Sequence, residues 1–358
     1  MPPSGALAPP APGASVLVTG GAGFIGSRLV TRLLADTPWR VVTLDRLTYA
    51  GNRASLGPAL DHPRHTFVHG DIGDRTLVGD LLRAHRPRAV LHVAAESHVD
   101  RSIDGPAAFA VTNVLGTVAL LTATLDHWRA LDATARAAFR FLAVSTDEVY
   151  GSVETGEAGP GSVYAPRSPY AASKAASDHF VHAFHHTYGL PVLTTHGSNT
   201  YGPFQYPEKL VPLLILNAIE GRPLPLYGDG GNVRDWLHVD DHVRALQCVL
   251  AEGAPGGVYP VAGAHPLTNL EVAHAVCDLV DQRIPGCPSV RTRIRFVPDR
   301  PGHDRRYAVD ASALRSLGWA PGTPFPEGLA QTVAWYLDNP AWLAGVAAHR
   351  ERLGAHGG

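Results

Sequence analysis

Tyr170 and Lys174 lie four residues apart in the segment SPYAASKAASDH, a spacing that suits proton transfer. Ser168 is a favoured N-cap and Pro169 a favoured first-turn residue, so we expect both side chains on one face of a helix, one turn apart. A nearby ammonium stabilises a phenolate and lowers the pKa of the tyrosine, which would let it take a proton from a hydroxyl group. The alternative is an ordinary tyrosine and lysine on a helix surface.

A second candidate group is Thr146-Asp147-Glu148, which follows the apolar segment RFLAVS. Two adjacent carboxyl groups provide one acid and one base if their environments separate their pKa values. Taken alone, this turn is more typical of a solvated loop or a helix cap. Its place at the carboxyl end of a predicted strand favours a chemical role, because ligands bind at that edge of open α/β sheets.

The third motif is the glycine turn Gly20, Gly23 and Gly26, which follows SVLVT and opens a predicted helix. In a chain with 37 glycines the spacing alone is weak and is also compatible with a plain tight turn. At a strand-to-helix junction, however, backbone amides and the helix N-terminus hold a pyrophosphate. The motif therefore predicts a dinucleotide site.

Asp45 ends the next predicted strand, where a carboxylate takes the ribose hydroxyls of a dinucleotide. It would repel a 2′-phosphate and so favours NAD over NADP, although the positive charge of Arg46 offsets part of that preference. Asp71 and Ile72 follow the third predicted strand and would either cradle the adenine or form an ordinary turn.

These motifs need elements to position them, and the chain alternates short β-branched runs with longer helical ones. The expected strands are 15–20, 40–45, 65–71, 88–94, 140–146 and 191–198, and the expected helices are 24–36, 74–85, 104–130 and 169–189. Continuous apolar strands between helices indicate a parallel sheet covered on both faces. The pattern predicts an α/β protein with a Rossmann-type doubly wound parallel sheet.

After residue 198 the alternation loosens, and a smaller, discontinuous C-terminal substrate-binding domain is expected. The predicted division gives residues 15–197 and 237–263 to the NAD-binding domain and residues 198–236 and 264–358 to the substrate-binding domain. WLHVDDHVRALQCVLAEG is expected to supply a strand and a helix that return to the main sheet, and GVYPVAG one more strand. Residues 1–14 are expected to form a flexible tail.

Composition excludes several classes of protein. With 45% hydrophobic residues and a net charge of -2, the chain is too apolar for disorder, and no charge excess draws it to nucleic acid or an anionic membrane. The expectation is no signal peptide, no membrane-spanning run and a cytoplasmic location. Cys248, Cys277 and Cys287 form no C-x-x-C pair, which is typical of free thiols in a reducing compartment.

The chain has 19 histidines, among them His182, His185 and His186 in one predicted helix. The sequence has no H-E-x-x-H motif, so we expect surface or packing roles for these residues and no metal site.

The glycine turn, the Tyr-Lys pair and the strand-end threonine resemble the extended short-chain dehydrogenase/reductase family. Further segments are similar to its dTDP-glucose 4,6-dehydratase branch, namely HVAAESHVDRSI, STDEVYG, SPYAASKAASDH, YGPFQYPEKLVP, YGDGGNVRDWLHVDDH and RPGHDRRYAVD. The resemblance runs from about Val16 to Trp335. It implies NAD as cofactor, dTDP-glucose as substrate, and a homodimer formed through the predicted helices 104–130 and 170–188.

The resemblance also implies roles for single residues. Tyr170 would take the C4 hydroxyl proton while hydride passes to NAD, with Lys174 reaching the nicotinamide ribose and Thr146 hydrogen-bonded to the C4 oxygen. Glu148 would then remove the C5 hydrogen and Asp147 would protonate the departing C6 hydroxyl. Hydride returns to C6, which leaves dTDP-4-keto-6-deoxyglucose and restores NAD.

Two binding sets follow from the same resemblance. Besides the three glycines, the cofactor set is Phe24, Ile25, Asp45, Thr48, Asp71, Ile72, Ala94, Ala95, Thr112, Tyr170, Lys174 and Thr200. The substrate set is Ser97, Thr146, Asn199, Lys209, Leu210, Tyr227, Arg234, Asn269, His303 and Tyr307. Lys209 and Arg234 suit a diphosphate, and Tyr227 would wall the thymine. The family commonly has a second asparagine where this chain has Thr200, whose hydroxyl still forms hydrogen bonds.

Other functions remain open at this point. Within enzymes, these are a UDP-glucose 4,6-dehydratase, a 4-epimerase and a decarboxylase. A 4-epimerase needs no acid and base at C5 and C6, so Asp147 and Glu148 argue against it. From another class, an inactive nucleotide-binding regulator would not need Thr146, Asp147, Glu148, Tyr170 and Lys174 together.

The use of lysine is unusual. Of the 30 basic residues, only Lys174 and Lys209 are lysines and the other 28 are arginines. Both lysines fall in predicted site segments, which marks two positions where arginine should be a poor substitute.

Overall fold

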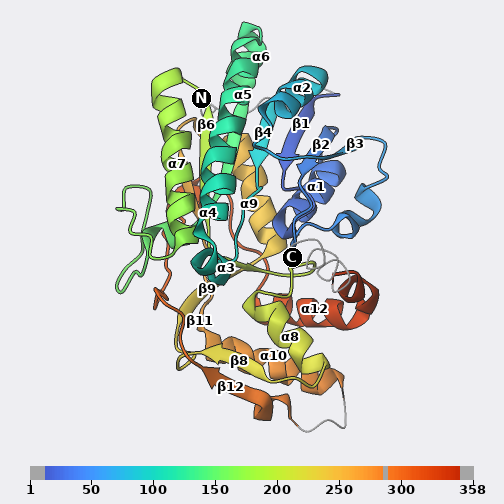
Figure 1. The fold of residues 1–358 in the computed structure, drawn as a ribbon, viewed down its shortest axis with the longest axis vertical. Helices are drawn as coiled ribbons and strands as arrows, with labels where there is room; N and C mark the ends of the chain where they lie inside the picture. The colour runs from blue at the N-terminus through green and yellow to red at the C-terminus, as the bar shows by residue number, and fades with distance from the viewer. Residues whose placement is uncertain (1–12, 285–288, 347–358) are drawn as a thin grey trace.

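The structure is a computed structural model that describes residues 13–284 and 289–346. Figure 1 shows a large sheet flanked by helices and, below it, a smaller region built from α8, α10, α12 and short strands. The predicted tail lies outside the described residues except for its last two positions, and so does Cys287.

Within the described residues, seven strands form one sheet in the order β10-β6-β5-β4-β1-β2-β3, and every neighbouring pair is parallel. The strands are β1 (Ser15–Thr19), β2 (Arg40–Asp45), β3 (His65–His69), β4 (Ala89–His92), β5 (Arg140–Thr146), β6 (Val192–Gly197) and β10 (Val258–Val261). The chain runs outward from β1 through β2 and β3, then crosses to β4 on the other side. This reversal creates a switch point at the carboxyl ends of β1 and β4, where α/β sheets bind ligands. The predicted fold class is confirmed.

Helices cover both faces of this sheet, as continuous apolar strands require. One face carries α1 (Phe24–Asp36) and α9 (Val239–Glu252), and the other carries α2 (Arg75–His85), α5 (Thr117–Arg129) and α7 (Pro169–Tyr188). Successive strand residues point to opposite faces. Accordingly, Val16 and Val18 belong to the cluster under α1 and α9, whereas Leu17 belongs to the cluster under α2, α5 and α7.

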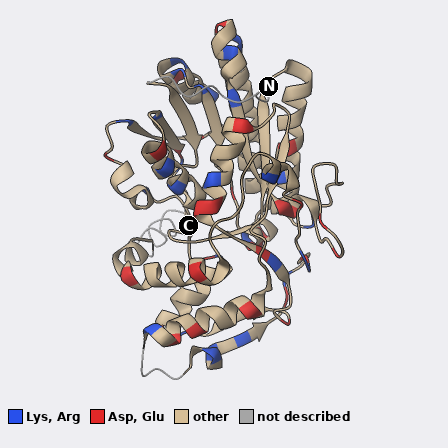
Figure 2. Cartoon of the chain, turned by 180° about the vertical axis from the view of Figure 1, so that it is seen from behind, with Lys and Arg blue, Asp and Glu red and all other residues tan. Residues whose placement is uncertain are grey.

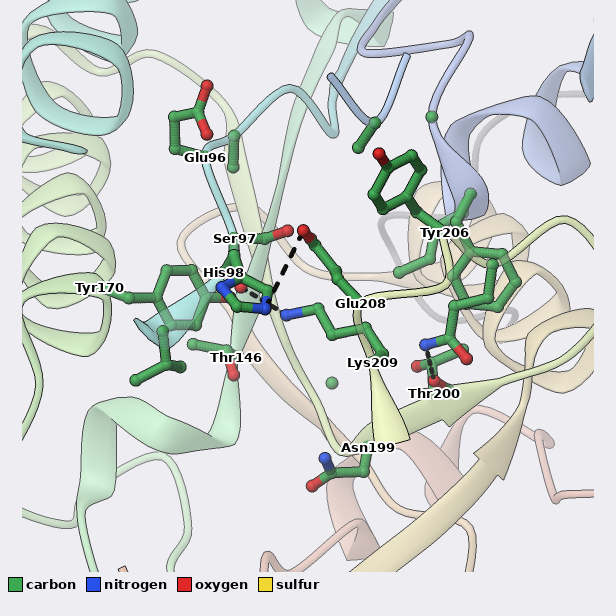
Figure 3. Close-up of a pocket in the computed structure, with 18 of the residues that line it drawn as sticks. Glu96, Ser97, His98, Thr146, Tyr170, Asn199, Thr200, Tyr206, Glu208 and Lys209 are labelled. Atoms are coloured by element: carbon green, nitrogen blue, oxygen red, sulfur yellow. Dashed lines mark hydrogen bonds and ion pairs between the residues drawn. The ribbon is translucent and has the colours of Figure 1, made fainter. Parts of the chain in front are cut away.

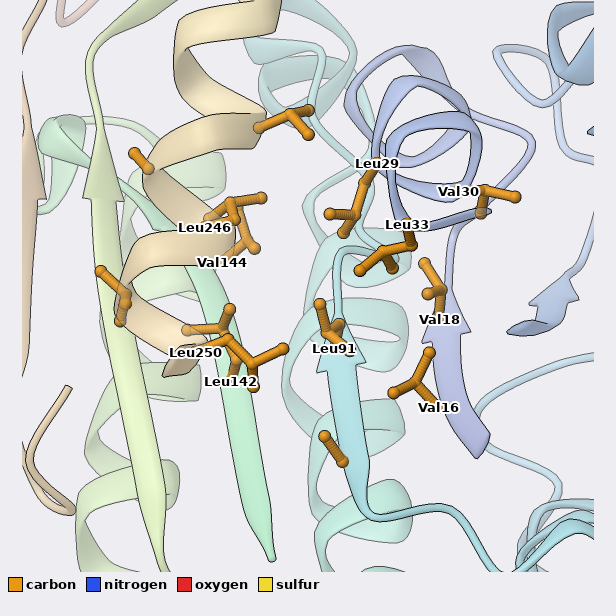
Figure 4. Close-up of a cluster of buried hydrophobic side chains, with 14 of the residues drawn as sticks. Val16, Val18, Leu29, Val30, Leu33, Leu91, Leu142, Val144, Leu246 and Leu250 are labelled. Carbon is orange, nitrogen blue, oxygen red and sulfur yellow. The ribbon is translucent and has the colours of Figure 1, made fainter. Parts of the chain in front are cut away.

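Figure 4 shows the first of these clusters, with Leu29 and Leu33 of α1 and Leu246 and Leu250 of α9 directed at the strands. The apolar residues of α1 recur at helical spacing, so one stripe of the helix is buried and the rest faces solvent.

The predicted helix over residues 104–130 is present as the continuous helical stretch Pro106–Arg129, which starts after Gly105 and contains a π-helical segment. The structure has α3 (Val99–Asp104), α4 (Pro106–Phe109), a π-helix η2 (Ala110–Gly116) and then α5, with α6 (Ala133–Ala138) after it. Gly105 interrupts the first turn with φ −140° and ψ 66°, because a residue before proline is disfavoured in helical conformation.

The helical stretch Pro106–Arg129 is long and apolar enough to cross a membrane by length and composition, with a mean hydropathy of 1.7. Half of it is buried, and Leu120 and Leu121 are fully buried among the residues of α2, α7 and the sheet. This burial is typical of a helix that covers a sheet.

The smaller region has its own core. In it, β7 (Asn199–Tyr201), β9 (Val233–His238) and β11 (Pro266–Thr268) form one sheet, and β8 (Leu224–Tyr227) pairs with β12 (Ile294–Val297). The helices α8 (Leu210–Ile219), α10 (Asn269–Arg283) and α12 (Phe325–Asp338) pack there around Tyr201, Leu214, Trp236 and Val276.

One expectation about this region is wrong: the strand in WLHVDDH does not return to the main sheet. It is β9, which pairs with β7 and β11, while β10 occupies the edge of the main sheet beside β6. The chain leaves β9 at His238, whose side chain accepts a hydrogen bond from the amide of Asp240 and caps α9. Only the helix therefore returns.

The remaining short elements are η1 (Arg53–Ala59), η3 (Asp147–Tyr150), η4 (Val290–Arg293) and α11 (Ser312–Ser316). Leu314 of α11 and Trp319 pack in the same cluster as α1 and α9. The segment 312–319 thus contributes to the core of the large sheet, although the predicted division places it in the other domain. The division itself stays a prediction.

Charged residues of both signs are spread over the large sheet region and the smaller region alike (Figure 2). This distribution agrees with the net charge of -2 and leaves no strong field of one sign in this view.

Candidate active site

A cavity of about 500 Å³ lies at the carboxyl ends of the main strands, between the large sheet and the smaller region. Every residue that the sequence predicts for catalysis or binding lines it. These are Gly20, Gly23, Phe24, Ile25, Gly26, Asp45, Thr48, Asp71, Ile72, Ala94, Ala95, Ser97, Thr112, Thr146, Asp147, Glu148, Tyr170, Lys174, Asn199, Thr200, Lys209, Leu210, Tyr227, Arg234, Asn269, His303 and Tyr307. Their individual ligand contacts stay predictions.

The glycine turn connects β1 to α1 and lines the cavity. Gly20 has φ +71°, and a side chain there would lie 2.6 Å from the backbone of Ala94. A side chain at Gly26 would overlap the carbonyl oxygen of Gly20. The glycines therefore permit a tight turn that brings backbone amides and the N-terminus of α1 to the cavity wall, an arrangement that fits a pyrophosphate.

Asp45 ends β2 with its carboxylate held by two backbone amides. Its Oδ2 accepts from Ala22 and its Oδ1 from Leu47, both at 2.8 Å. Burial raises the pKa of Asp45, and the two backbone hydrogen bonds oppose that shift. The adjacent Arg46 lies 3.1 Å from Asp71 Oδ2, so its charge is paired and opposes the NAD preference less than the sequence alone suggested.

The Tyr170 and Lys174 pair lies in the first turns of α7, as predicted. Ser168 Oγ accepts from the amide of Ala171 at 3.0 Å, and Pro169 begins the helix. Lys174 Nζ is buried and donates to the carbonyl of Val144 at 2.8 Å. Lys174 is therefore held against the end of β5.

We predicted that the Lys174 ammonium lowers the pKa of Tyr170, but other groups affect this pKa more in this structure. Burial raises the pKa of Tyr170 and the charge of Glu148 raises it further, whereas a hydrogen bond with Thr146 lowers it. Burial also lowers the pKa of Lys174. Thr146, and not Lys174, is thus the group of this chain that favours the phenolate most directly.

Asp147 and Glu148 follow β5 on η3, yet their surroundings differ. Asp147 is 3% exposed, and burial together with the charge of Glu148 raises its pKa well above the usual value. Thr146 Oγ1 lies 3.3 Å from Asp147 Oδ1 and donates to it. Asp147 is therefore suited to carry a proton that it can donate.

Glu148 is only half-buried and faces the other wall of the cavity. Tyr307 donates to Glu148 Oε2 at 3.4 Å and to Asp304 Oδ2 at 2.9 Å. Arg234 lies over the ring of Tyr307, with its guanidinium carbon 4.1 Å from the ring centre. The two neighbouring carboxyl groups thus have different partners, as an acid and a base require.

The second lysine joins the two walls of the cavity. Lys209 Nζ donates to the carbonyl of Ser97 at 2.5 Å, and Figure 3 shows its side chain reaching across toward Ser97 and His98. Tyr227 makes a similar link, because its hydroxyl donates to Asp100 at 3.0 Å and its ring meets that of His303 at 6.0 Å. The segment 97–100 therefore contacts the substrate side directly.

Several ionisable residues of the cavity were missed from the sequence. Glu208 lies beside Lys209, 3.9 Å from His98 and 3.7 Å from Arg101. Burial raises the pKa of Glu208 to about 7 and lowers that of His98 to about 4. Arg300 is 3.7 Å from Asp100. These residues lie in the segments HVAAESHVDRSI, PEKL and RPGHDRR, which carry the family resemblance and could have identified them.

The histidines of α7 have local partners. His185 hydrogen-bonds to the carbonyl of Leu190 at 2.8 Å, and His182 to Thr194 at 3.4 Å. Across residues 13–284 and 289–346, no group of three or more His, Cys, Asp or Glu side chains is placed to hold a metal ion.

Known proteins share this architecture and sequence. The family model described as GDP-mannose 4,6 dehydratase matches residues 17–332. The chain is 57% identical to a dTDP-glucose 4,6-dehydratase of Xanthomonas campestris, over 96% of this chain and 99% of that one.

Two solved structures are similar to this one in fold as well as in sequence. A dTDP-glucose 4,6-dehydratase of Streptomyces venezuelae, solved with NAD bound, is 48% identical with a TM-score of 0.84 over 92% of this chain and 98% of that one. A UDP-glucose 4-epimerase of Thermus thermophilus in complex with NAD is 32% identical, with a TM-score of 0.79 over 90% and 98% of the two chains. The fold therefore accommodates more than one sugar-nucleotide reaction, and the sequence identity distinguishes between them. The chain belongs to the dTDP-glucose 4,6-dehydratases of the extended short-chain dehydrogenase/reductase family.

Proposed function

We propose that this chain is an NAD-dependent lyase that converts dTDP-glucose to dTDP-4-keto-6-deoxyglucose and water, as a step in deoxysugar synthesis. The observation that carries the proposal is the buried Asp147, whose pKa is raised by burial, next to the more open Glu148, both in one cavity with Tyr170. An epimerase has no use for this acid and base. The proposal is also supported by the 57% identity to a relative of that name.

The glycine turn and Asp45 fit NAD, since the turn leaves room for a pyrophosphate and Asp45 ends β2 on the cavity wall. When bound there, NAD would supply the hydride acceptor for oxidation at C4 and the hydride donor for reduction at C6.

Tyr170 takes the proton of the C4 hydroxyl while the C4 oxygen is held by Thr146. The raised pKa of Tyr170 means that the phenolate needs help beyond this chain's own side chains. The positive nicotinamide ring would provide it, with the Lys174 ammonium one turn along the helix. Lys174 stays fixed because Val144 accepts its hydrogen bond.

Oxidation at C4 acidifies the hydrogen at C5, and Glu148 takes that proton. Asp147 gives its proton to the C6 hydroxyl, which leaves as water while a C5–C6 double bond forms. Hydride would then add at C6 while Glu148 returns its proton to C5. Tyr170 releases the C4 proton and Asp147 regains one from solvent, so the sugar loses one water and every side chain returns to its starting state. The half-buried Glu148 thus serves as the base and the buried Asp147 as the acid.

The direct test is incubation with dTDP-glucose, with the product analysed by mass and by the chemistry of its ketone. We expect a 4-keto sugar that has lost one water. UDP-glucose serves as the matched second substrate, since preferential conversion of it would replace the thymidine assignment. Recovery of the C4 epimer would show an epimerase, and unchanged sugar with tight nucleotide binding would show an inactive regulator.

We also infer a homodimer formed through the helical stretch 106–129 and α7. These neighbouring helices carry large apolar side chains that are exposed, namely Val111 (56%), Leu115 (63%), Phe180 (42%) and Tyr188 (44%). Exposed apolar residues gathered on adjacent helices are typical of a contact surface. A cytoplasmic location is proposed as well, supported by the free thiols of Cys248 and Cys277.

A further inference from the structure

Behind the reacting groups lies a buried polar cluster that the mechanism above does not use. It centres on Asp178 of α7, which is 1% exposed, and on His196 of β6, which is also buried. Asp178 Oδ2 accepts from Ser145 Oγ at 2.7 Å and lies 3.2 Å from His196 Nε2. Burial of an unpaired carboxylate costs free energy, so a buried carboxylate with several partners suggests a structural or functional role.

Two tyrosines complete the cluster from the segment after β5. The hydroxyl of Tyr150 is 2.7 Å from His196 Nδ1, and that of Tyr164 is 3.1 Å from His196 Nε2 and 3.4 Å from Asp178. Both nitrogens of His196 and one oxygen of Asp178 are therefore occupied. The cluster joins α7, β5, β6 and η3 into one hydrogen-bonded unit.

Position along α7 links this unit to catalysis. Tyr170, Lys174 and Asp178 are spaced by four residues and so share one face of the helix. Lys174 donates to the carbonyl of Val144, and Asp178 accepts from the hydroxyl of Ser145. Val144 and Ser145 directly precede Thr146 in β5. The two hydrogen bonds therefore fix α7 to the end of β5, next to Asp147 and Glu148.

We propose that Asp178 is a positioning residue for the dehydratase reaction, which fixes the register between α7 and the end of β5 and balances the buried ammonium of Lys174. The proposal rests on the roles of Tyr170 and Lys174 stated under the proposed function.

The charge of Asp178 has a predictable effect on both partners. It raises the pKa of Lys174, against the lowering by burial, and it also raises that of Tyr170. The other titratable groups that interact with Asp178 are His182 of α7, His196 of β6, and the two tyrosines. Tyr164 also meets the ring of His179, at 5.2 Å.

The sign of the expected pH effect follows from these two shifts. Activity requires deprotonated Tyr170 and protonated Lys174. As the pH increases, activity therefore rises around the pKa of Tyr170 and falls around the pKa of Lys174. Without the carboxylate both pKa values decrease. The whole pH profile should therefore move toward acid, by on the order of one pH unit for a buried unit charge nearby.

The test is the pH profile of dTDP-glucose turnover by the full-length protein with NAD, for wild type, Asp178→Asn and Ser145→Ala. Asp178→Asn keeps an oxygen that accepts from Ser145 but removes the charge, so the profile should shift to lower pH while KM for dTDP-glucose stays constant. Ser145→Ala keeps the charge but removes one hydrogen bond. We expect a loss of roughly fivefold in kcat at every pH, with no shift.

Asp241→Asn is the matched control. Asp241 is equally buried and accepts from the amides of Gly322 and Thr323, away from the cavity lining. It should lower the melting temperature and leave the pH profile unmoved.

A wild-type pH profile in folded Asp178→Asn would overturn the charge role, and full kcat in Ser145→Ala would overturn the register role. If Asp178→Asn does not fold, Ser145→Ala still decides the second point. Wild type that fails to dehydrate dTDP-glucose would instead refute the proposed function, so the two failures are distinguishable.

Discussion

The two carboxyl groups that follow β5 are neighbours in the sequence but have different surroundings. Asp147 is buried beneath Thr146, whereas Glu148 opens toward Tyr307 and the cavity. Burial raises the pKa of Asp147 and so favours its protonated form. This difference turns an acidic pair, which elsewhere would be a solvated turn, into a donor and an acceptor.

A substitution of Glu148 separates the steps. In Glu148→Gln the side chain keeps its size but cannot take the C5 proton, so elimination should slow by about 100- to 10,000-fold. Oxidation at C4 does not need this group, so reduced cofactor should accumulate on the protein when dTDP-glucose is added. The absorbance of bound NADH after mixing measures this. Absence of any NADH signal would move Glu148 into the first step.

Lys174 is the residue where arginine should fail although its charge is the same. The Nζ atom is buried and donates to a single carbonyl, that of Val144. The larger planar guanidinium brings more donors than this space can satisfy, and its unmade hydrogen bonds cost free energy. Lys174→Arg should therefore reduce the rate of the first oxidation by at least about tenfold.

Pre-steady-state formation of NADH measures the effect of Lys174→Arg. Arg28→Lys, at a half-buried surface ion pair with Asp240, is the matched control and should be near wild type. Normal oxidation by Lys174→Arg would count against a special role for the chain's few lysines.

At the scale of elements, the glycine turn depends on backbone that no side chain can enter. A methyl group at Gly26 would overlap the carbonyl oxygen of Gly20, and the first turn of α1 would have to move. Gly26→Ala should therefore weaken NAD binding by at least about tenfold, a cost of about 1.4 kcal/mol, which a modest backbone shift easily reaches.

Titration of the nucleotide-free protein with NAD, followed by the quenching of tryptophan fluorescence, measures this affinity. Gly159→Ala is the control, because a side chain there has no atom within 4 Å, and its affinity should equal that of wild type. Equal NAD affinity in Gly26→Ala and wild type would exclude close backbone approach as the reason for the glycine.

The sequence predicted elements well where pattern and burial agree. The predicted helix 24–36 is α1, and the predicted strand 140–146 is β5, because strict apolar spacing reflects which face is buried. The predicted helix 104–130 corresponds to the helical stretch Pro106–Arg129, although the pattern does not reveal the π-helical segment Ala110–Gly116 inside it. The pattern failed for β9, since pairing partners are set by tertiary contacts that periodicity does not encode.

The candidate site was likewise predicted in part from the sequence. Motifs and family resemblance led to residues that all line one cavity. Several of them, such as Thr146 and Asp45, lie at the carboxyl end of a strand, where the pattern alone already predicts a ligand site. Glu208 and Arg300 were missed because their importance arises from contacts across the cavity, with residues more than a hundred positions away. The raised pKa of Tyr170 was missed too, since burial is not visible in a four-residue spacing.

At the scale of the molecule, the cavity is closed by contacts between regions distant in sequence, and the helices on one face of the large sheet expose several apolar side chains. The helices on that face expose Leu115 and Val111, whose transfer out of water on association would stabilise a pair of subunits. This arrangement would place the two cavities of a dimer on separate subunits, because no cavity-lining residue lies among the exposed apolar ones except Tyr227.

A charge placed on this face should separate the subunits. Leu115→Glu puts a carboxylate where the exposed helices would meet, and an unpaired buried charge strongly opposes association. We therefore expect a mass near 38.0 kDa, that of one chain, by light scattering of this variant, and twice that for wild type. Val163→Glu is the control: Val163 is 85% exposed but lies in the loop after η3, so the variant should remain dimeric. A monomeric wild type, or a dimeric Leu115→Glu, would direct the search for the contact to another face.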